Sequence, residues 1–324
     1  MKIGIVGAGR MGRGIALTYI LAGIPVKLVD NKDRLREERE ALRTSVTQEL
    51  LSDLRFLVSQ SLISEKDVED ILALLSLFFS EEICEVQDCE IIYDAVPEVH
   101  EIKKKTFAAV CQHADDSAII ASTTSTFLVT ELSNFVTHPS RFLNAHWLNP
   151  AHLMPLVELS VSDSTSSSVV ERFVSSLEDI GKKPVICNAS PGYIVPRIQA
   201  LAMNEAARLV EEGVASAEDV DKAILYGFGL RFSVLGMLEF IDWGGGDILY
   251  YASKYLTEQT GSRYEVPEII AENMRSGKNG LRDGRGFFDY KTVNVDDYRN
   301  RRLGDFVNAL REKNLLPIHR RVDK

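Results

Sequence analysis

A glycine-rich turn near the start of the chain constrains the fold more than any other segment. Three glycines follow the G-x-G-x-x-G pattern: Gly7, Gly9 and Gly12. Apolar residues before the turn predict a short buried strand, and the spacing after it predicts a helix over 10–21. Such a turn lets a pyrophosphate approach the backbone and meet the free N–H groups of a helix N-terminus. We therefore predict a dinucleotide site that includes Arg10 and Met11.

An acidic residue at the end of the next predicted strand, 26–29, indicates which dinucleotide binds. Asp30 follows Gly12 by 18 residues. A carboxylate at about this distance accepts hydrogen bonds from ribose hydroxyls and repels a 2′-phosphate. We therefore predict NAD rather than NADP. The alternative is a glycine-rich turn in an α/β protein that binds no dinucleotide.

Composition narrows the class of protein. A length of 324 residues and a hydrophobic fraction of 45% predict a soluble protein with two domains. The net charge of -10 argues against nucleic acid or an anionic membrane as a partner, and no apolar run is long enough to span a membrane. Four cysteines without C-x-x-C spacing, and a first strand that leaves no room for a targeting peptide, predict a cytoplasmic protein. No metal site is expected, because no histidines or cysteines share ligand-like spacing.

The order of predicted elements indicates the fold class. Strands alternate with helices up to residue 188, which predicts a Rossmann-like doubly wound α/β domain over 1–188. Two helices at about 34–75 are predicted to form a hairpin inserted into this domain. Helical periodicity dominates afterwards, so an all-α C-terminal domain is predicted over 189–324, ending in a docked helix at 296–315.

A histidine and a glutamate follow the predicted strands at positions suited to catalysis. His146 ends the predicted strand 142–146, and Glu158 lies 12 residues later near the next strand. Ligands bind at the carboxyl edge of open α/β sheets. The histidine could remove the hydroxyl proton of an alcohol while NAD takes the hydride, and the carboxylate would hold its tautomer. The alternative is a hydrogen-bonded core histidine and a surface acid.

Together these motifs resemble the 3-hydroxyacyl-CoA dehydrogenase family over nearly the whole chain. The matching segments are 7–16, 95–98 with Lys103, 122–125, 146–150, 156–158, 191–195 and 284–290. The resemblance implies that His146 is the general base, that Glu158 orients it and that Ser125 hydrogen-bonds the substrate hydroxyl.

The same resemblance extends to the cofactor and the second domain. It implies that Glu98, Lys103 and Asn149 lie near the nicotinamide half of the cofactor. We assign Glu98 and Lys103 to the cofactor and Asn149 to the substrate. It further implies that the helical second domain forms a homodimer and closes over the active site.

Three features depart from the family pattern. The family segment Gly-Phe-Ile-Val-Asn-Arg is Gly-Tyr-Ile-Val-Pro-Arg here, so Pro196 replaces an asparagine that contacts the substrate region. The segment around Arg231 resembles the branch of L-gulonate 3-dehydrogenase (lambda-crystallin) and L-carnitine dehydrogenase, and an arginine in a closed pocket suits carboxylate binding. A helix-start surface arginine is the alternative for Arg231. The chain also continues 34 residues past Tyr290, beyond compact acyl-CoA members.

The leading hypothesis is NAD-dependent oxidation of the 3-hydroxyl of an L-3-hydroxyacyl-CoA, similar to 3-hydroxybutyryl-CoA, in fatty acid metabolism. One alternative is a dehydrogenase of a small free hydroxy acid, such as gulonate or carnitine, held by Arg231. An alternative of another class is a non-catalytic NAD-binding structural protein, against which the intact His146 and Glu158 argue.

Overall fold

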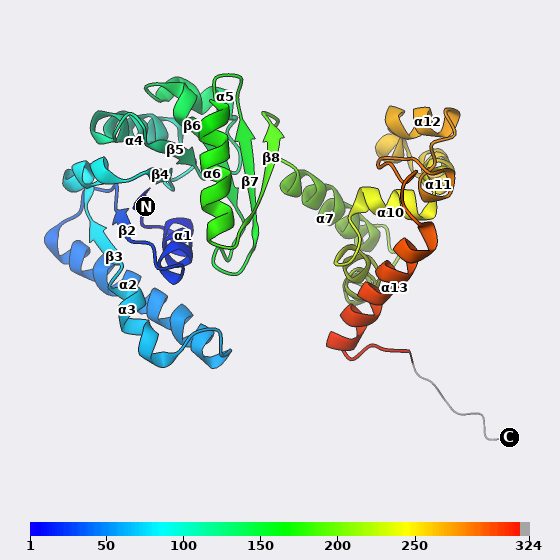
Figure 1. Ribbon diagram of the computed structural model, residues 1–324, viewed down its shortest axis with the longest axis horizontal. Helices are drawn as coiled ribbons and strands as arrows, with labels where there is room; N and C mark the ends of the chain where they lie inside the picture. The colour runs from blue at the N-terminus through cyan, green and yellow to red at the C-terminus, as the bar shows by residue number, and fades with distance from the viewer. Residues whose placement is uncertain (318–324) are drawn as a thin grey trace. The chain divides into compact units, whose positions relative to one another are not determined.

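The computed structural model describes residues 1–317, in two compact units (Figure 1). The first unit is Met1–Leu201 and the second begins at Ala202. The division lies within helix α7 (Val195–Glu211), a few residues after the predicted boundary at 189. Each unit is described by itself below.

The first unit is built on one eight-stranded sheet in the order β3-β2-β1-β4-β5-β6-β7-β8. Every neighbouring pair is parallel except β6 and β7, which are antiparallel. The order reverses between β1 and β4, which makes the carboxyl ends of these strands the switch point where ligands bind in such folds. The predicted doubly wound sheet is confirmed. The strands are β1 (Ile3–Val6), β2 (Val26–Val29), β3 (Leu75–Phe78), β4 (Ile91–Asp94), β5 (Ile119–Ser122), β6 (Phe142–Trp147), β7 (Leu156–Val161) and β8 (Lys183–Asn188).

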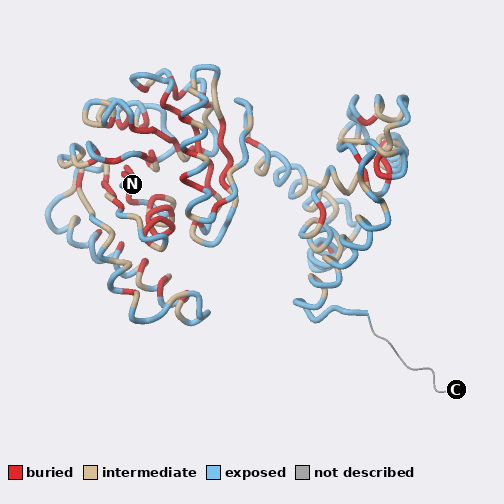
Figure 2. Tube along the Cα trace, in the orientation of Figure 1, coloured by how far each residue is buried: buried red, intermediate tan, exposed pale blue. Residues whose placement is uncertain are grey.

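Helices bury both faces of this sheet, and Figure 2 shows buried residues concentrated along its strands. Side chains alternate between faces along a strand, so Ile5 joins one apolar cluster and Val6 the other. The helices are α1 (Arg10–Leu21), α2 (Arg36–Ser59), α3 (Val68–Leu72), α4 (His100–His113), α5 (Val129–Leu132) and α6 (Ser167–Asp179). Short 3-10 segments complete the unit: η1 (Glu65–Asp67), η2 (Ser80–Asp88), η3 (Ser133–Phe135) and η4 (Pro139–Arg141).

The predicted hairpin at 34–75 consists of α2, η1 and α3. One face of α2 carries leucine and valine at helical spacing, and these side chains belong to the sheet's apolar cluster: Leu42, Val46, Leu50, Leu54 and Leu57. Arg13 of α1 also pairs with Glu49 of α2. The hairpin is therefore packed against the nucleotide fold rather than projecting from it.

The second unit is helical, as predicted. After α7 come α8 (Ala217–Ala223), a π-helix (η5, Ile224–Gly229), α9 (Leu230–Phe232), α10 (Met237–Gly244), α11 (Gly246–Thr260), η6 (Ser262–Tyr264), α12 (Glu268–Arg275), η7 (Leu281–Asp283) and α13 (Val295–Glu312). Buried Asp242 accepts the backbone N–H groups of Phe287 and Phe288 at 3.0 and 2.9 Å. This carboxylate explains the glycine at 286, because a Cβ there would lie 2.1 Å from Asp242 Oδ1.

Among residues 1–317, no single helix has the length and hydropathy for a membrane span. One bent pair, Ala217–Phe232 with Met237–Gly244, meets the criteria only when its two helices are counted together. The same residues contain no group of three or more acidic, histidine or cysteine side chains placed to hold a metal ion.

Candidate active site

The glycine turn between β1 and α1 is closed on two sides and open on the third. Gly7 has φ +119°, and a Cβ there would lie 2.4 Å from the carbonyl oxygen of Ala95. A Cβ on Gly12 would lie 1.9 Å from the carbonyl oxygen of Gly7. Gly9 has nothing within 4 Å of its Cβ position, so its backbone is free to meet a ligand. This arrangement fits a pyrophosphate at the N-terminus of α1.

A cleft of about 520 Å³ lies over this turn. Seven of the predicted site residues line it: Gly7, Gly9, Arg10, Met11, Asp30, Glu98 and Ser125. Asp30 is almost fully buried, and one of its oxygens accepts a hydrogen bond from Arg34. A carboxylate has about four acceptor positions, so Asp30 can still bind ribose hydroxyls. Arg34 also lines the cleft, and the sequence reasoning did not find it.

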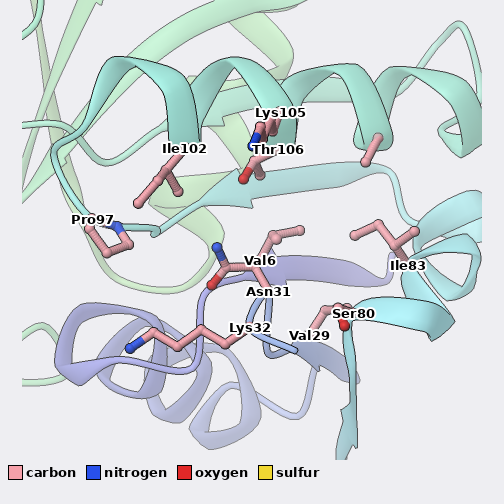
Figure 3. A pocket seen from close by; sticks show the side chains of 11 residues that line it. Val6, Val29, Asn31, Lys32, Ser80, Ile83, Pro97, Ile102, Lys105 and Thr106 are labelled. Atoms are coloured by element: carbon pink, nitrogen blue, oxygen red, sulfur yellow. The ribbon is translucent and has the colours of Figure 1, made fainter. Parts of the chain in front are cut away.

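An adjoining pocket of about 310 Å³ extends the cleft past Asp30. Asn31 and Lys32 line both spaces. Figure 3 shows Ile102 and Thr106 projecting from α4 toward Val6. Its largely apolar walls suit a flat ring such as adenine. The sequence reasoning missed this pocket because its walls come from strands, a loop and two helices far apart in the chain.

The His146–Glu158 pair is formed across the antiparallel strands β6 and β7. The two residues are direct partners in the register, and His146 Nδ1 lies 2.9 Å from Glu158 Oε2. His146 is 6% exposed and Glu158 is fully buried. Within residues 1–317, Nε2 of the ring has no hydrogen-bond partner. The pair can therefore accept a proton at Nε2 while the carboxylate holds the opposite side of the ring.

The segment before α7 closes around this pair. Glu158 Oε1 accepts the N–H groups of Ile194 and Val195, both at 2.9 Å. The Tyr193 ring stacks on His146, with centroids 4.8 Å apart. Pro196 is the second residue of α7, where a missing N–H is tolerated. The sequence reasoning had not assigned Tyr193 a role.

A second buried pair lies between β4 and α4. Lys103 Nζ is 2.8 Å from Asp94 Oδ2, and the Ser122 hydroxyl donates to the same oxygen at 2.8 Å. Burial raises the pKa of Asp94, while the Lys103 ammonium opposes that rise. Lys103 is fully buried and does not line the cleft, so any effect it has on the cofactor is indirect.

Glu98 connects this buried pair to the cleft. Its Oε1 accepts the N–H of Ser125 at 2.7 Å, and its Oε2 accepts the Thr124 hydroxyl at 2.9 Å. Lys103 Nζ lies 3.8 Å from Oε2. Glu98 therefore fixes the loop that presents Ser125, besides lining the cleft itself.

Two predicted substrate residues lie outside this cluster. Asn149 is exposed and does not line the cleft. Arg231 belongs to the second unit, in α9, directly after the π-helix. Its guanidinium lies 4.7 Å from the centre of the Phe240 ring and forms no ion pair with any residue of the described chain.

Comparison with known proteins identifies the family. The NAD binding domain of 3-hydroxyacyl-CoA dehydrogenase matches residues 2–190, and the C-terminal domain of that family matches residues 192–290. The chain belongs to the 3-hydroxyacyl-CoA dehydrogenase family. Its cofactor is accordingly NAD, and the protein is an NAD-dependent oxidoreductase. This membership favours an enzyme over a non-catalytic structural protein.

Relatives of this dehydrogenase include enzymes for more than one kind of substrate. A 3-hydroxybutyryl-CoA dehydrogenase of Mycobacterium tuberculosis is 31% identical, over 89% of this chain and 98% of the relative. A solved 3-hydroxyacyl-CoA dehydrogenase of Archaeoglobus fulgidus is 32% identical with a TM-score of 0.75, over 98% of this chain and 100% of that one. That match includes the extension past residue 290. A 5-formyl-3-hydroxy-2-methylpyridine 4-carboxylate 5-dehydrogenase of Mesorhizobium japonicum is 27% identical, over 89% of this chain and 90% of the relative.

Proposed function

We propose that this dehydrogenase oxidises the 3-hydroxyl group of a short L-3-hydroxyacyl-CoA, similar to 3-hydroxybutyryl-CoA, to the 3-oxo form. The observation that carries the proposal is the buried His146–Glu158 pair, which leaves Nε2 free. The names of the relatives support the substrate class.

In this proposal each residue has one task. NAD, when bound over the glycine turn, supplies the hydride acceptor. Ser125 hydrogen-bonds the substrate hydroxyl, and His146 Nε2 takes its proton. Glu158 stabilises the resulting imidazolium, since its own negative charge is held by two backbone N–H groups. Glu98 keeps the Ser125 loop in place.

The test is NADH formation with a substrate panel. The panel contains L-3-hydroxybutyryl-CoA, its D isomer, gulonate and carnitine, each with NAD. We expect turnover of the L-acyl-CoA alone. Turnover of a free acid with no activity on the thioester would overturn the proposed substrate.

A second candidate is a small free hydroxy acid bound by Arg231. Its guanidinium has no ion pair within the described chain, and one relative is named for a pyridine carboxylate substrate. Hydrogen bonds to charged groups contribute roughly 1.5–3 kcal/mol, so Arg231→Met should raise KM for a free acid by roughly 10–150-fold. Arg231→Lys is the control, because it keeps the charge without the planar fork. If Arg231→Met leaves kcat/KM for the thioester unchanged, the arginine has no role in that reaction.

We also propose a homodimer formed through the helical region. Along α7, Ile198, Leu201 and Val210 are exposed apolar residues. Association would cover such a face, and two-fold dimers are the commonest oligomers. Light scattering at micromolar concentration should give the mass of a dimer. A monomer at that concentration would refute it.

We further propose a cytoplasmic location and a role in fatty acid metabolism. All four cysteines are free thiols, which suits a reducing compartment. Activity against acyl-CoA substrates of increasing chain length would test the metabolic role.

A further inference from the structure

Tyr193 has a backbone conformation that calls for an explanation. Its φ is +48°, directly after Gly192 with φ +76°. Bulky residues seldom adopt this region, and such strain persists where surrounding contacts enforce it. Tyr193 is also buried, although it lies in the link between β8 and α7. A specific set of contacts therefore holds this side chain.

The ring of Tyr193 makes the first of these contacts. It lies on the His146 imidazole with centroids 4.8 Å apart and planes inclined by only 15°. Stacked aromatic pairs at this separation attract each other beyond simple burial. Glu158 fixes the imidazole at Nδ1, which alone allows the ring to tilt about that hydrogen bond. A flat surface on one face removes this tilt and fixes the direction of Nε2.

The hydroxyl of Tyr193 makes the second contact. It donates to the carbonyl oxygen of Thr124 at 2.7 Å. Burial raises the pKa of the Tyr193 hydroxyl, so it remains a proton donor at neutral pH. The next residue along the chain is Ser125, whose N–H is bound to Glu98. The hydroxyl thus ties the ring that covers the base to the loop that presents the substrate-binding serine.

The backbone after Tyr193 makes the third contact. The N–H groups of Ile194 and Val195 bind Glu158 Oε1, so one short segment holds both members of the His146–Glu158 pair. Turning these amides toward Glu158 while placing the ring on His146 requires a sharp change of direction at Gly192 and Tyr193. The positive φ values at both residues provide it.

We propose that Tyr193 is a positioning residue for the reaction, which sets the direction of His146 Nε2 through its ring and the distance to the Ser125 loop through its hydroxyl. The inference rests on the proposed role of His146 as the base. The family segment quoted above carries phenylalanine at this position, so the hydroxyl contact is the part that this chain adds.

Two substitutions separate the ring from the hydroxyl. Tyr193→Phe keeps the stack and loses the bond to Thr124, so kcat should fall by about 2–10-fold, the range of one hydrogen bond. Tyr193→Leu removes the stack as well, and kcat should fall by roughly 10–100-fold, as expected when a reacting group is misplaced. The affinity for NAD should hold in both, because Tyr193 does not line the cleft.

A matched control distinguishes positioning from general destabilisation. Phe107→Leu truncates a fully buried ring that stacks edge-to-face on Phe142, away from His146. It should lower the thermal midpoint at least as much as Tyr193→Leu and leave kcat near wild type. The His146 ring protons should lose their ring-current shift by NMR in Tyr193→Leu and keep it in Tyr193→Phe.

The outcomes are distinct. If Tyr193→Leu retains the kcat of Phe107→Leu, or if the ring-current shift is unchanged, the positioning role is wrong. If His146→Ala also retains activity, the proposed base is wrong and the inference fails with it. Loss of activity in His146→Ala together with full activity in Tyr193→Leu rejects the inference alone.

Discussion

Two buried ion pairs lie in the same sheet, and they are completed in opposite ways. In the Asp94–Lys103 pair, Asp94 is bound by Lys103, by the Ser122 hydroxyl and by the N–H of Val96, and the ammonium also contacts Glu98. In the His146–Glu158 pair, the carboxylate is equally saturated, but the ring keeps one nitrogen without a hydrogen-bond partner in the described chain.

The difference separates a pair that holds the fold from a pair that can react. Removing one partner of a buried pair leaves an uncompensated charge, which is costly. Lys103 has no free acceptor or cleft-facing atom, so its contribution is to the arrangement of Asp94 and Glu98. His146 needs its carboxylate for orientation, but its function lies at the nitrogen that is left open.

The largest expected effect follows from removing the base. His146→Ala should lower kcat by on the order of 10²–10⁴-fold, the usual contribution of a general base, while NAD binding is retained. Steady-state kinetics and NAD titration measure the two quantities. His113→Ala, at the C-terminal end of α4, is the control and should behave as wild type. Turnover in His146→Ala equal to that of the control would rule out this mechanism.

Breaking the second pair should act on stability. Lys103→Met leaves the Asp94 carboxylate buried without its cation, which should cost about 3–5 kcal/mol of unfolding free energy. Lys104→Met, one position along the same helix and exposed, should change it by no more than about 0.5 kcal/mol. Urea unfolding gives both values. Equal stability of the two variants would show that the Asp94–Lys103 pair does not hold the fold.

Weakening the reactive pair without removing the base should have a smaller effect. Glu158→Gln keeps an oxygen for the N–H groups of Ile194 and Val195 but loses the charge that stabilises the imidazolium. We expect kcat to fall by roughly 10–100-fold, less than in His146→Ala. Glu171→Gln, an exposed acid on α6, is the control. A fall as large as that of His146→Ala would mean that Glu158 itself handles the proton.

The smallest expected effect concerns the cofactor. Asp30→Ala removes a carboxylate that can bind ribose hydroxyls and frees Arg34, so KM for NAD should rise by about tenfold and NADP should be partly accepted. Asp33→Ala removes a nearby exposed acid that lines neither pocket, and it should leave the preference unchanged. Preference of the wild type for NADPH would contradict the interpretation of Asp30.

Local patterns predicted the fold and part of the site. The glycine turn could be read from the sequence because its demands are local: Gly7 and Gly12 leave no room for a side chain. The spacing of His146 and Glu158 also worked, since a short connection between antiparallel strands places them opposite each other.

Contacts between distant segments could not be read in the same way. Tyr193 reaches Thr124 across 69 positions, and its stacking on His146 depends on a left-handed backbone that no periodicity reveals. Lys103 sits among exposed lysines on α4, so its burial appears only when the helix is packed on β4. The pocket beside Asp30 draws its walls from several elements and has no sequence signature.

The central claim is that His146, and not the other buried pair, carries the proton of the reaction. It is tested most directly by the pH dependence of kcat/KM in wild type, His146→Ala and Lys103→Met. A general base must be neutral to accept a proton, so activity falls in acid as the base is protonated. We predict that this acid limb is present in wild type and in Lys103→Met and absent from the residual activity of His146→Ala. An unchanged acid limb in His146→Ala would contradict the account.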